Sequence, residues 1–167
     1  MHDRLTQGDI DKMQEEIDER RLKLQPELIK AVQEARAQGD LSENFEYYAA
    51  KREKRQNESR IRYLENMIKT AILIEDHAAA DEVSMNKSIE VYFPEDDETE
   101  VFRIVTTIRG NSLKNLISIE SPLGRALLHH HVGDTVHVKV DDRSGYDVVI
   151  KGIGVDEGED ADTIRSF

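Results

Sequence analysis

Two long stretches of the chain repeat their apolar residues every three or four positions, which places those side chains on one face of a helix. The first repeat comprises Ile10, Met13, Ile17, Leu24, Leu28, Val32 and Ala35. The second follows the a/d pattern of a coiled-coil seam and comprises Tyr47, Ala50, Lys54, Asn57, Ile61, Leu64, Ile68 and Ala71. Because only a short turn separates them, we predict an antiparallel two-helix coiled-coil hairpin over residues 1–75.

The first repeat changes register between Ile17 and Leu24, close to Pro26. A proline inside a helix removes a hydrogen bond and costs about 3 kcal/mol unless it starts a new turn. We therefore expect a kink or a short break near Pro26.

Composition restricts the compartment and the kind of partner. The chain of 167 residues has no cysteine, so disulfides and thiolate metal sites are excluded and any metal must be held by oxygen or imidazole. Its net charge of −12 argues against a protein that coats nucleic acid by bulk electrostatics. No apolar run is long enough to suggest a membrane span, and the start of the chain is polar. We expect a cytoplasmic protein that does not bind membranes.

Beyond residue 75 the helical repeat ends and short strand-like runs begin, separated by turn residues. Ser121 is a favourable N-cap and Pro122 a favourable first residue for a short helix after the third run. We predict an α+β fold, with a small sheet domain at residues 87–155 after a linker at 76–86. The acidic segment 156–167 is expected to be disordered because of its charge. The runs are SIEVYF, EVFRIVTTI, NLISIES, DTVHVKV and YDVVIKGIGV.

The predicted bend of the hairpin, near residues 39–47, contains two carboxylates, Asp40 and Glu43. Carboxylates three residues apart share a face if the turn is helical, so they could share one cation. Magnesium is commonly held by one or two carboxylates together with water and phosphate. Alternatively, Gly39 ends the first helix while Asp40 and Glu43 form a capping box for the second. The spacing alone favours capping, and the two interpretations are compatible.

The other residues near the bend also have two interpretations. The cations there either pair with nearby glutamates at i, i+4 spacing or contact a phosphate backbone. Phe45, Tyr47 and Tyr48 either stack on nucleic-acid bases or pack against the opposite helix, and we interpret Tyr47 as mainly a core residue. The run from His129 to His131 does not predict a metal site, because consecutive helical residues diverge by about 100°.

Several segments of the chain resemble the bacterial transcript cleavage factors of the GreA/GreB family, with a basic patch closer to the GreA branch. The resemblance implies an FKBP-like sheet domain without prolyl isomerase activity. It also implies a hairpin that enters the secondary channel of backtracked RNA polymerase and stimulates cleavage of the nascent RNA 3′ end by the polymerase. The protein would act as a monomer, would not itself be an enzyme and would hold no cofactor tightly. The similar segments are LTQGDIDKMQEEI, ARAQGDLSENFEYYAAK, RIRYLENMIKTAILIED and NLISIESPLGRALLHHHVGDTVHVKV.

The resemblance also assigns roles to residues. Asp40 and Glu43 would help to hold a Mg²⁺ shared with the polymerase active site. The residues that shape the tip would be Asn44, Glu46 and Tyr47. Arg36 and Lys51 lie at positions similar to the family's basic patch, which contacts RNA. Arg52 and Arg55 are added to the RNA-contacting set because helical spacing places Arg55 on shared flanks with Lys51 and with Arg52. The residues that match the polymerase-docking motif are Ser121, Pro122, Leu123 and Leu127. The alternative is that Leu127 serves only the core and that Ser121 and Pro122 serve only as a helix cap.

Two other functions remain open at this stage. A Gre-like paralogue would occupy the channel and modulate or inhibit the polymerase without promoting cleavage. An unrelated helical-hairpin adaptor would use Asp40 and Glu43 only as caps and would not bind polymerase.

Overall fold

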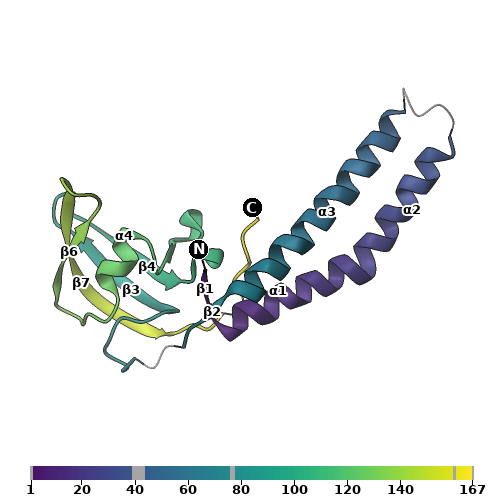
Figure 1. The fold of residues 1–167 in the computed structure, drawn as a ribbon. Helices are drawn as coiled ribbons and strands as arrows, with labels where there is room; N and C mark the ends of the chain where they lie inside the picture. The colour runs from purple at the N-terminus through teal and green to yellow at the C-terminus, as the bar shows by residue number, and fades with distance from the viewer. Residues whose placement is uncertain (1, 39–43, 76–77, 160, 167) are drawn as a thin grey trace. The chain divides into compact units, whose positions relative to one another are not determined.

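A computed structural model describes residues 2–38, 44–75, 78–159 and 161–166, and the chain divides into two compact units (Figure 1). The first unit contains residues 10–72 and the first three residues, and the second contains residues 4–9 and 73–167. We had assigned the whole of residues 1–75 to the hairpin. The N-terminal segment 4–9 belongs instead to the second unit.

The first unit is an antiparallel helical hairpin, as predicted (Figure 1). Side-chain contacts across it join residues whose numbers run in opposite directions, from Ala35 with Asn44 to Gln25 with Glu58. The elements of its first arm are α1 (Gln7–Glu19), the π-helical turn η1 (Arg20–Leu24) and α2 (Gln25–Arg36), and the second arm is α3 (Phe45–Thr70).

The break predicted near Pro26 is confirmed as the π-helical turn η1. The backbone N–H of Gln25 donates to the carbonyl of Arg20, five residues earlier, instead of four. Pro26 then lies in the first turn of α2, where the missing N–H of proline costs least. The first arm thus continues as a helix past Pro26, because a residue in the first turn does not need its own N–H for a helical hydrogen bond.

The seam of the hairpin contains buried polar side chains besides its apolar ones. The carboxylate of Glu16 accepts from Nε of Arg60 (2.8 Å) and from Nε of Arg20 (2.7 Å). Asn57 is buried and donates to Oε1 of Gln25 (2.9 Å) and to the carbonyl of Arg20 (3.2 Å). Partial burial raises the pKa of Glu16, but the hydrogen bonds from the two arginines outweigh it and the pKa is lowered. Such groups are satisfied in only one register of the two arms. The buried apolar residues of the hairpin are Met13, Ile17, Leu28, Ala35, Ile61 and Leu64.

The second unit is built on a five-stranded sheet in the order β5-β4-β3-β7-β6, with all neighbours antiparallel except β4 and β5. The helix α4 (Pro122–Leu127) connects β5 to β6, as the Ser121-Pro122 pair predicted. A separate two-stranded sheet is formed by β1 (Arg4–Leu5) and β2 (Ile72–Leu73). The five strands are β3 (Lys87–Phe93), β4 (Glu98–Val105), β5 (Leu116–Ser118), β6 (Thr135–Lys139) and β7 (Gly145–Asp156), and two 3-10 turns are η3 (Thr107–Arg109) and η4 (Ser112–Lys114).

The α+β fold class is confirmed, but the segment that we predicted as a linker at 76–86 contributes to the core. Val83 and Met85 are buried among the apolar side chains of the sheet. No helix in the described ranges combines the length and the hydropathy that a bilayer crossing requires.

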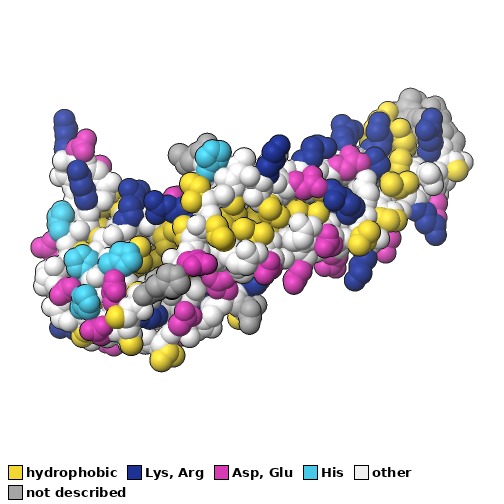
Figure 2. Space-filling model, turned by 60° about the horizontal axis from the view of Figure 1, so that its bottom comes forward, with side chains coloured by type: hydrophobic (Ala, Val, Ile, Leu, Met, Phe, Trp, Pro, Cys, Tyr) yellow, Lys and Arg dark blue, Asp and Glu magenta, His cyan; other side chains and the backbone are white. Residues whose placement is uncertain are grey.

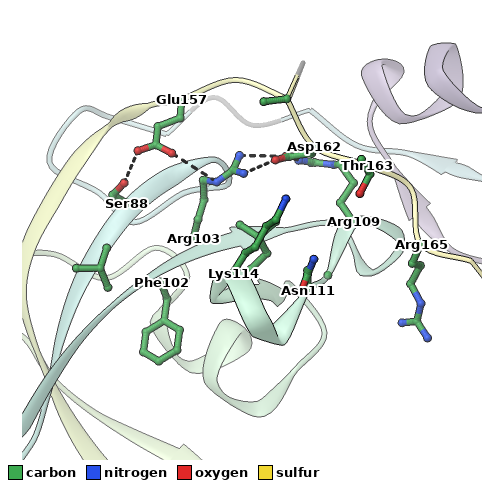
Figure 3. A pocket seen from close by; sticks show the side chains of 14 residues that line it. Ser88, Phe102, Arg103, Arg109, Asn111, Lys114, Glu157, Asp162, Thr163 and Arg165 are labelled. Carbon is green, nitrogen blue, oxygen red and sulfur yellow. Dashed lines mark hydrogen bonds and ion pairs between the residues drawn. The ribbon is translucent and has the colours of Figure 1, made fainter.

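The described part of the acidic tail, for which we expected disorder, contacts a buried arginine of the sheet domain. The side chain of Arg109 is fully buried, and it donates from Nε to Asp9 (2.7 Å) and from Nη1 to Asp162 (2.6 Å). Asp162, only 7% exposed, also accepts from Arg103 (Figure 3). Burial raises the pKa of Asp162, but the hydrogen bonds from the two arginines lower it below its usual 3.8. The tail carboxylate therefore compensates guanidinium charge that the domain buries.

We expect Asp162→Asn to destabilise the sheet domain by about 2–3 kcal/mol, because it leaves Arg109 and Arg103 with less compensating charge. A lowered pKa stabilises the fold above the unfolded value and stops doing so as the pH falls through the folded value. The difference from wild type should therefore shrink below about pH 4. Amide exchange in β3 and β7 measures it, with Asp142→Asn, on a fully exposed side chain, as the control. Equal protection of wild type and Asp162→Asn at pH 7 would contradict the assignment.

Gly124 of α4 should not tolerate alanine, because a Cβ there would lie well within the van der Waals contact distance of the carbonyl oxygen of Ser118. Overpacking of this kind typically costs about 1–3 kcal/mol. Gly152→Ala is the matched control, since its Cβ would meet only the Glu90 side chain at 3.5 Å and closer atoms are absent from the described surroundings. Thermal unfolding should show a clear loss for Gly124→Ala and a smaller change for Gly152→Ala; the reverse order would contradict the packing.

Candidate functional site

The end of the hairpin, where α2 and α3 meet, is the region to which the sequence assigns a function. Our predictions for Asp40 and Glu43 fall on residues 39–43, which lie outside those that the structure describes. The site is therefore defined by the residues on either side of that segment.

The side chain of Asn44 joins the two helices. Its Oδ1 accepts from the backbone N–H of Tyr47 (3.0 Å), which makes Asn44 the N-cap of α3. Its Nδ2 donates to the carbonyl of Ala35 near the end of α2 (2.7 Å). One amide thus satisfies an unpaired helix donor and bridges to the other arm.

This geometry corrects the capping interpretation of Asp40. Because α3 begins at Phe45, its N-cap is Asn44, four residues after Asp40. The carboxylate of Asp40 is therefore not required to cap α3. The sequence contained the signal, since asparagine is among the best N-cap residues, but the preceding acids matched a capping box and obscured it.

The three aromatic residues at the start of α3 have different surroundings. Tyr47, half-buried, lies with its ring centre 5.5 Å from that of Tyr48 and 5.3 Å from Nζ of Lys51. Phe45 is 85% exposed and Tyr48 is 47% exposed. Tyr47 thus takes part in local packing, whereas the rings of Phe45 and Tyr48 remain largely in contact with solvent. The sequence analysis interprets Tyr47 as mainly a core residue, and it is the only half-buried one of these three; for Phe45 and Tyr48 the sequence left both roles open.

The cations near the hairpin end are mostly unneutralised by the residues that the structure describes. Arg36, Arg52 and Arg55 are exposed and form no ion pair with any described side chain. Lys54, in contrast, pairs with Glu58 at 2.7 Å, so pairing at i, i+4 accounts for only part of the basic residues. Figure 2 shows Lys and Arg side chains gathered along the outer part of the hairpin, with hydrophobic side chains among them.

The residues predicted to dock on a polymerase lie around α4. Ser121 Oγ accepts from the N–H of Gly124 (3.0 Å), so it caps the helix. Pro122 is exposed and Leu123 is half-buried. Leu127 is fully buried in the core and cannot touch a partner. Of its two interpretations, docking residue or core residue, the structure supports the second.

The sheet domain has a cavity of about 380 Å³ beside the tail (Figure 3). Its lining includes Arg103 and Arg109, both of which bind Asp162, and the exposed Lys114. Its charged groups therefore serve mainly to hold the tail in place.

The described residues were also considered as possible metal ligands. Within the described ranges, no group of three or more His, Asp or Glu residues could hold a metal ion. The sequence analysis treats the histidine run as helical, but α4 ends at Leu127, before the run begins. His129 contacts Glu82 whereas His130 contacts Asp134, so these two histidines face different partners.

Comparison with known proteins gives the same family for both units. Residues 4–72 match the family model described as "Transcription elongation factor, N-terminal", and residues 78–154 match "Transcription elongation factor, GreA/GreB, C-term". A transcription elongation factor GreA of Limosilactobacillus fermentum is 42% identical over 130 residues, which cover 77% of this chain and 82% of the relative. One from Thermotoga neapolitana is 40% identical over 136 residues, covering 81% and 87%. The crystal structure of GreA factor homolog 1 from Thermus thermophilus aligns with a TM-score of 0.42 at 25% identity, covering 93% of this chain and all of that one.

Replacement of Asn44 should loosen the start of α3. Loss of an N-cap costs about 0.5–2 kcal/mol, and Asn44→Ala also loses the hydrogen bond to Ala35. Asn44→Asp keeps a good cap but lacks the donor, so it should lie between wild type and Asn44→Ala. Amide exchange at Tyr47 and Tyr48 reports the change, with Gln56→Ala on the exposed face of α3 as the control. If Asn44→Ala exchanged as slowly as wild type, the amide would not be the joint.

Proposed function

Because the chain belongs to the GreA/GreB family of transcription elongation factors, we propose that it rescues backtracked RNA polymerase. The hairpin end enters the secondary channel of the enzyme and stimulates cleavage of the nascent RNA near its 3′ end by the polymerase. The protein acts in the cytoplasm as a monomer and is not itself an enzyme. Family membership contradicts the third interpretation, that of an unrelated hairpin adaptor.

The structural observation that carries the proposal is the identity of the cap of α3. Asn44 caps this helix and bridges to α2, which frees Asp40 and Glu43 from that task. Because Asn44 supplies this cap, the fold of α3 does not require either acid, and both can be assigned to an ion that a partner brings. This supports the assignment of both acids to function in trans.

The donor chemistry of the two acids fits magnesium but does not complete a site. Mg²⁺ takes six oxygen ligands, commonly only one or two of them from protein carboxylates, so polymerase carboxylates, RNA phosphate and water would supply the rest. When bound, the ion stabilises the attacking and leaving oxygens of an in-line displacement. Asp40 and Glu43 would hold it as carboxylate ligands. The polymerase encloses the reaction and excludes bulk water, which an exposed hairpin end does not do alone.

The residues that flank the acids position the hairpin end and the RNA. Asn44 fixes the start of α3, while Glu46 and Tyr47 belong to its first turn. The cations assigned to RNA are Arg36, Lys51, Arg52 and Arg55; three of them carry charge that no described carboxylate neutralises. Ser121, Pro122 and Leu123 remain assigned to docking on the rim of the channel, whereas the buried Leu127 supports them from the core.

The test follows RNA cleavage in defined backtracked elongation complexes with Mg²⁺. We expect wild type to accelerate cleavage, and Asp40→Asn and Glu43→Gln each to reduce the stimulated rate at least about tenfold, because each removes a charged ligand from the ion. Polymerase binding of both variants should stay within about twofold of wild type. Asn44→Asp serves as a control for altered charge and geometry at the joint.

The outcomes separate the remaining alternatives. Binding without cleavage by wild type would identify the Gre-like paralogue that modulates the polymerase. Stimulation by both variants at the wild-type rate would remove the acids from the chemistry.

A further inference from the structure

A layer of polar side chains lies between two apolar stretches of the hairpin seam. In this layer Arg20 donates from Nη1 to Oδ1 of Asn57 (3.0 Å), and Nδ2 of Asn57 donates to Oε1 of Gln25 (2.9 Å). Nε2 of Gln25 in turn donates to Oε1 of Glu58 (2.8 Å). The ion pair of Glu16 with Arg60 completes the layer. We refer to Glu16, Arg20, Gln25, Asn57, Glu58 and Arg60 as the polar layer.

The apolar packing of the hairpin differs on the two sides of the polar layer. On the side of α1 the buried apolar side chains are Met13, Ile17, Ile61 and Leu64, each at most 7% exposed. On the side of the hairpin end, only Leu28 and Ala35 are buried among the described residues. Every side chain of α3 from Phe45 to Gln56 is half-buried or exposed. We refer to residues 10–19 and 61–70 as the inner segment, and to residues 25–36 and 45–56 as the outer segment.

The helical hydrogen bonding of the first arm changes at the same level. The π-helical bond of η1 joins two members of the polar layer, from the N–H of Gln25 to the carbonyl of Arg20. Nδ2 of Asn57 also donates to this carbonyl (3.2 Å). Single π-helical turns within α-helices frequently occur at functional positions. The change of helix type thus coincides with the change from apolar to polar packing.

Opening of the outer segment should require less free energy than opening of the inner segment. The stability of a helix in a protein comes mostly from packing of its apolar face. The inner segment buries four large apolar side chains, whereas the outer segment buries one leucine and one alanine. The polar layer transmits little of this stability outward, because its side chains regain hydrogen bonds to water when they separate. Proteins open locally along such differences in packing, as contiguous cooperative segments.

The far end of the outer segment is held together by Asn44. Its Nδ2 donates to the carbonyl of Ala35 on the opposite arm (2.7 Å), while its Oδ1 caps α3. The two arms of the outer segment are therefore joined at both limits, by Asn44 at the hairpin end and by the polar layer at the other end. Fraying from one end is hindered, so the arms separate as one unit.

We propose that the polar layer is the boundary of a local opening in the hairpin. The outer segment opens and closes as a separate cooperative unit while the inner segment stays closed. A partner that contacts both arms of the outer segment stabilises the closed form and shifts the equilibrium toward it. In the proposed function the secondary channel is such a partner, but the opening is a property of the free chain and does not rest on that function.

The test is native-state amide hydrogen exchange of the full chain at several urea concentrations below the unfolding transition. Amides of residues 30–36 and 50–56 should have protection factors at least tenfold lower than those of residues 62–68. Their protection should also depend less on urea, because opening of the outer segment exposes less surface than global unfolding. Asn44→Ala should lower the protection of the outer segment further, with that of the inner segment within twofold of wild type.

Asn57→Leu tests the boundary itself. Its partner Arg20 keeps other bonds, since Nε still donates to Glu16 and the carbonyl still accepts from Gln25. Leucine at a seam position adds apolar contact between the arms, so the variant should raise the protection of the outer segment at least threefold toward that of the inner segment. Asn66→Leu, the same change at an exposed position of α3, is the matched control and should leave the outer segment unchanged.

Two outcomes would overturn the proposal. The first is equal protection and equal urea dependence of the two segments in wild type, which would make the hairpin one cooperative unit. The second is unchanged or lower protection of the outer segment in Asn57→Leu, which would mean that the polar layer does not limit the coupling between the segments. Because the exchange is measured without polymerase, either result is distinguishable from failure of cleavage stimulation.

Discussion

The hydrogen bonds of the Asn44 amide determine what the end of the hairpin can do. The oxygen of this amide starts α3 and its nitrogen donates to the carbonyl of Ala35 on the other arm. Since Asn44 provides both bonds, the start of α3 does not depend on a carboxylate of Asp40 or Glu43. The functional assignment of Asp40 and Glu43 depends on this division of tasks.

Buried charged and amide side chains restrict how the segments of each unit can pack together. In the hairpin, Glu16 is shared by Arg20 of the same arm and Arg60 of the other arm, and a slip of one turn would separate the buried Arg60 from this carboxylate. In the sheet domain, Arg109 binds Asp9 from the N-terminal segment and Asp162 from the tail. Segments distant in sequence are thereby tied to the same unit. The register of the hairpin determines which residues of α3 face the first arm. It thereby determines which basic and aromatic residues of α3 point away from that arm.

Periodicity predicted the helices, the break near Pro26 and the strands, because these follow from local spacing and turn chemistry. It failed where distant groups decide the outcome. Composition predicted a disordered tail and gave no sign that Asp162 of this tail binds the buried Arg109. The 76–86 linker contains Val83, which packs in the core. At the hairpin end, the sequence assigned the cap to Asp40, since the capping-box pattern does not indicate which residue begins the helix, whereas the cap of α3 is Asn44.

The proposed function requires two acids at the hairpin end to help hold a magnesium ion in the active site of another enzyme. The most direct measurement is the Mg²⁺ concentration that gives half-maximal RNA cleavage in a backtracked complex. This concentration should fall severalfold when the wild-type chain is added, and Asp40→Asn should return it to the value of the polymerase alone while still binding. An unchanged concentration with wild type, or a decrease that persists in Asp40→Asn, would contradict the claim.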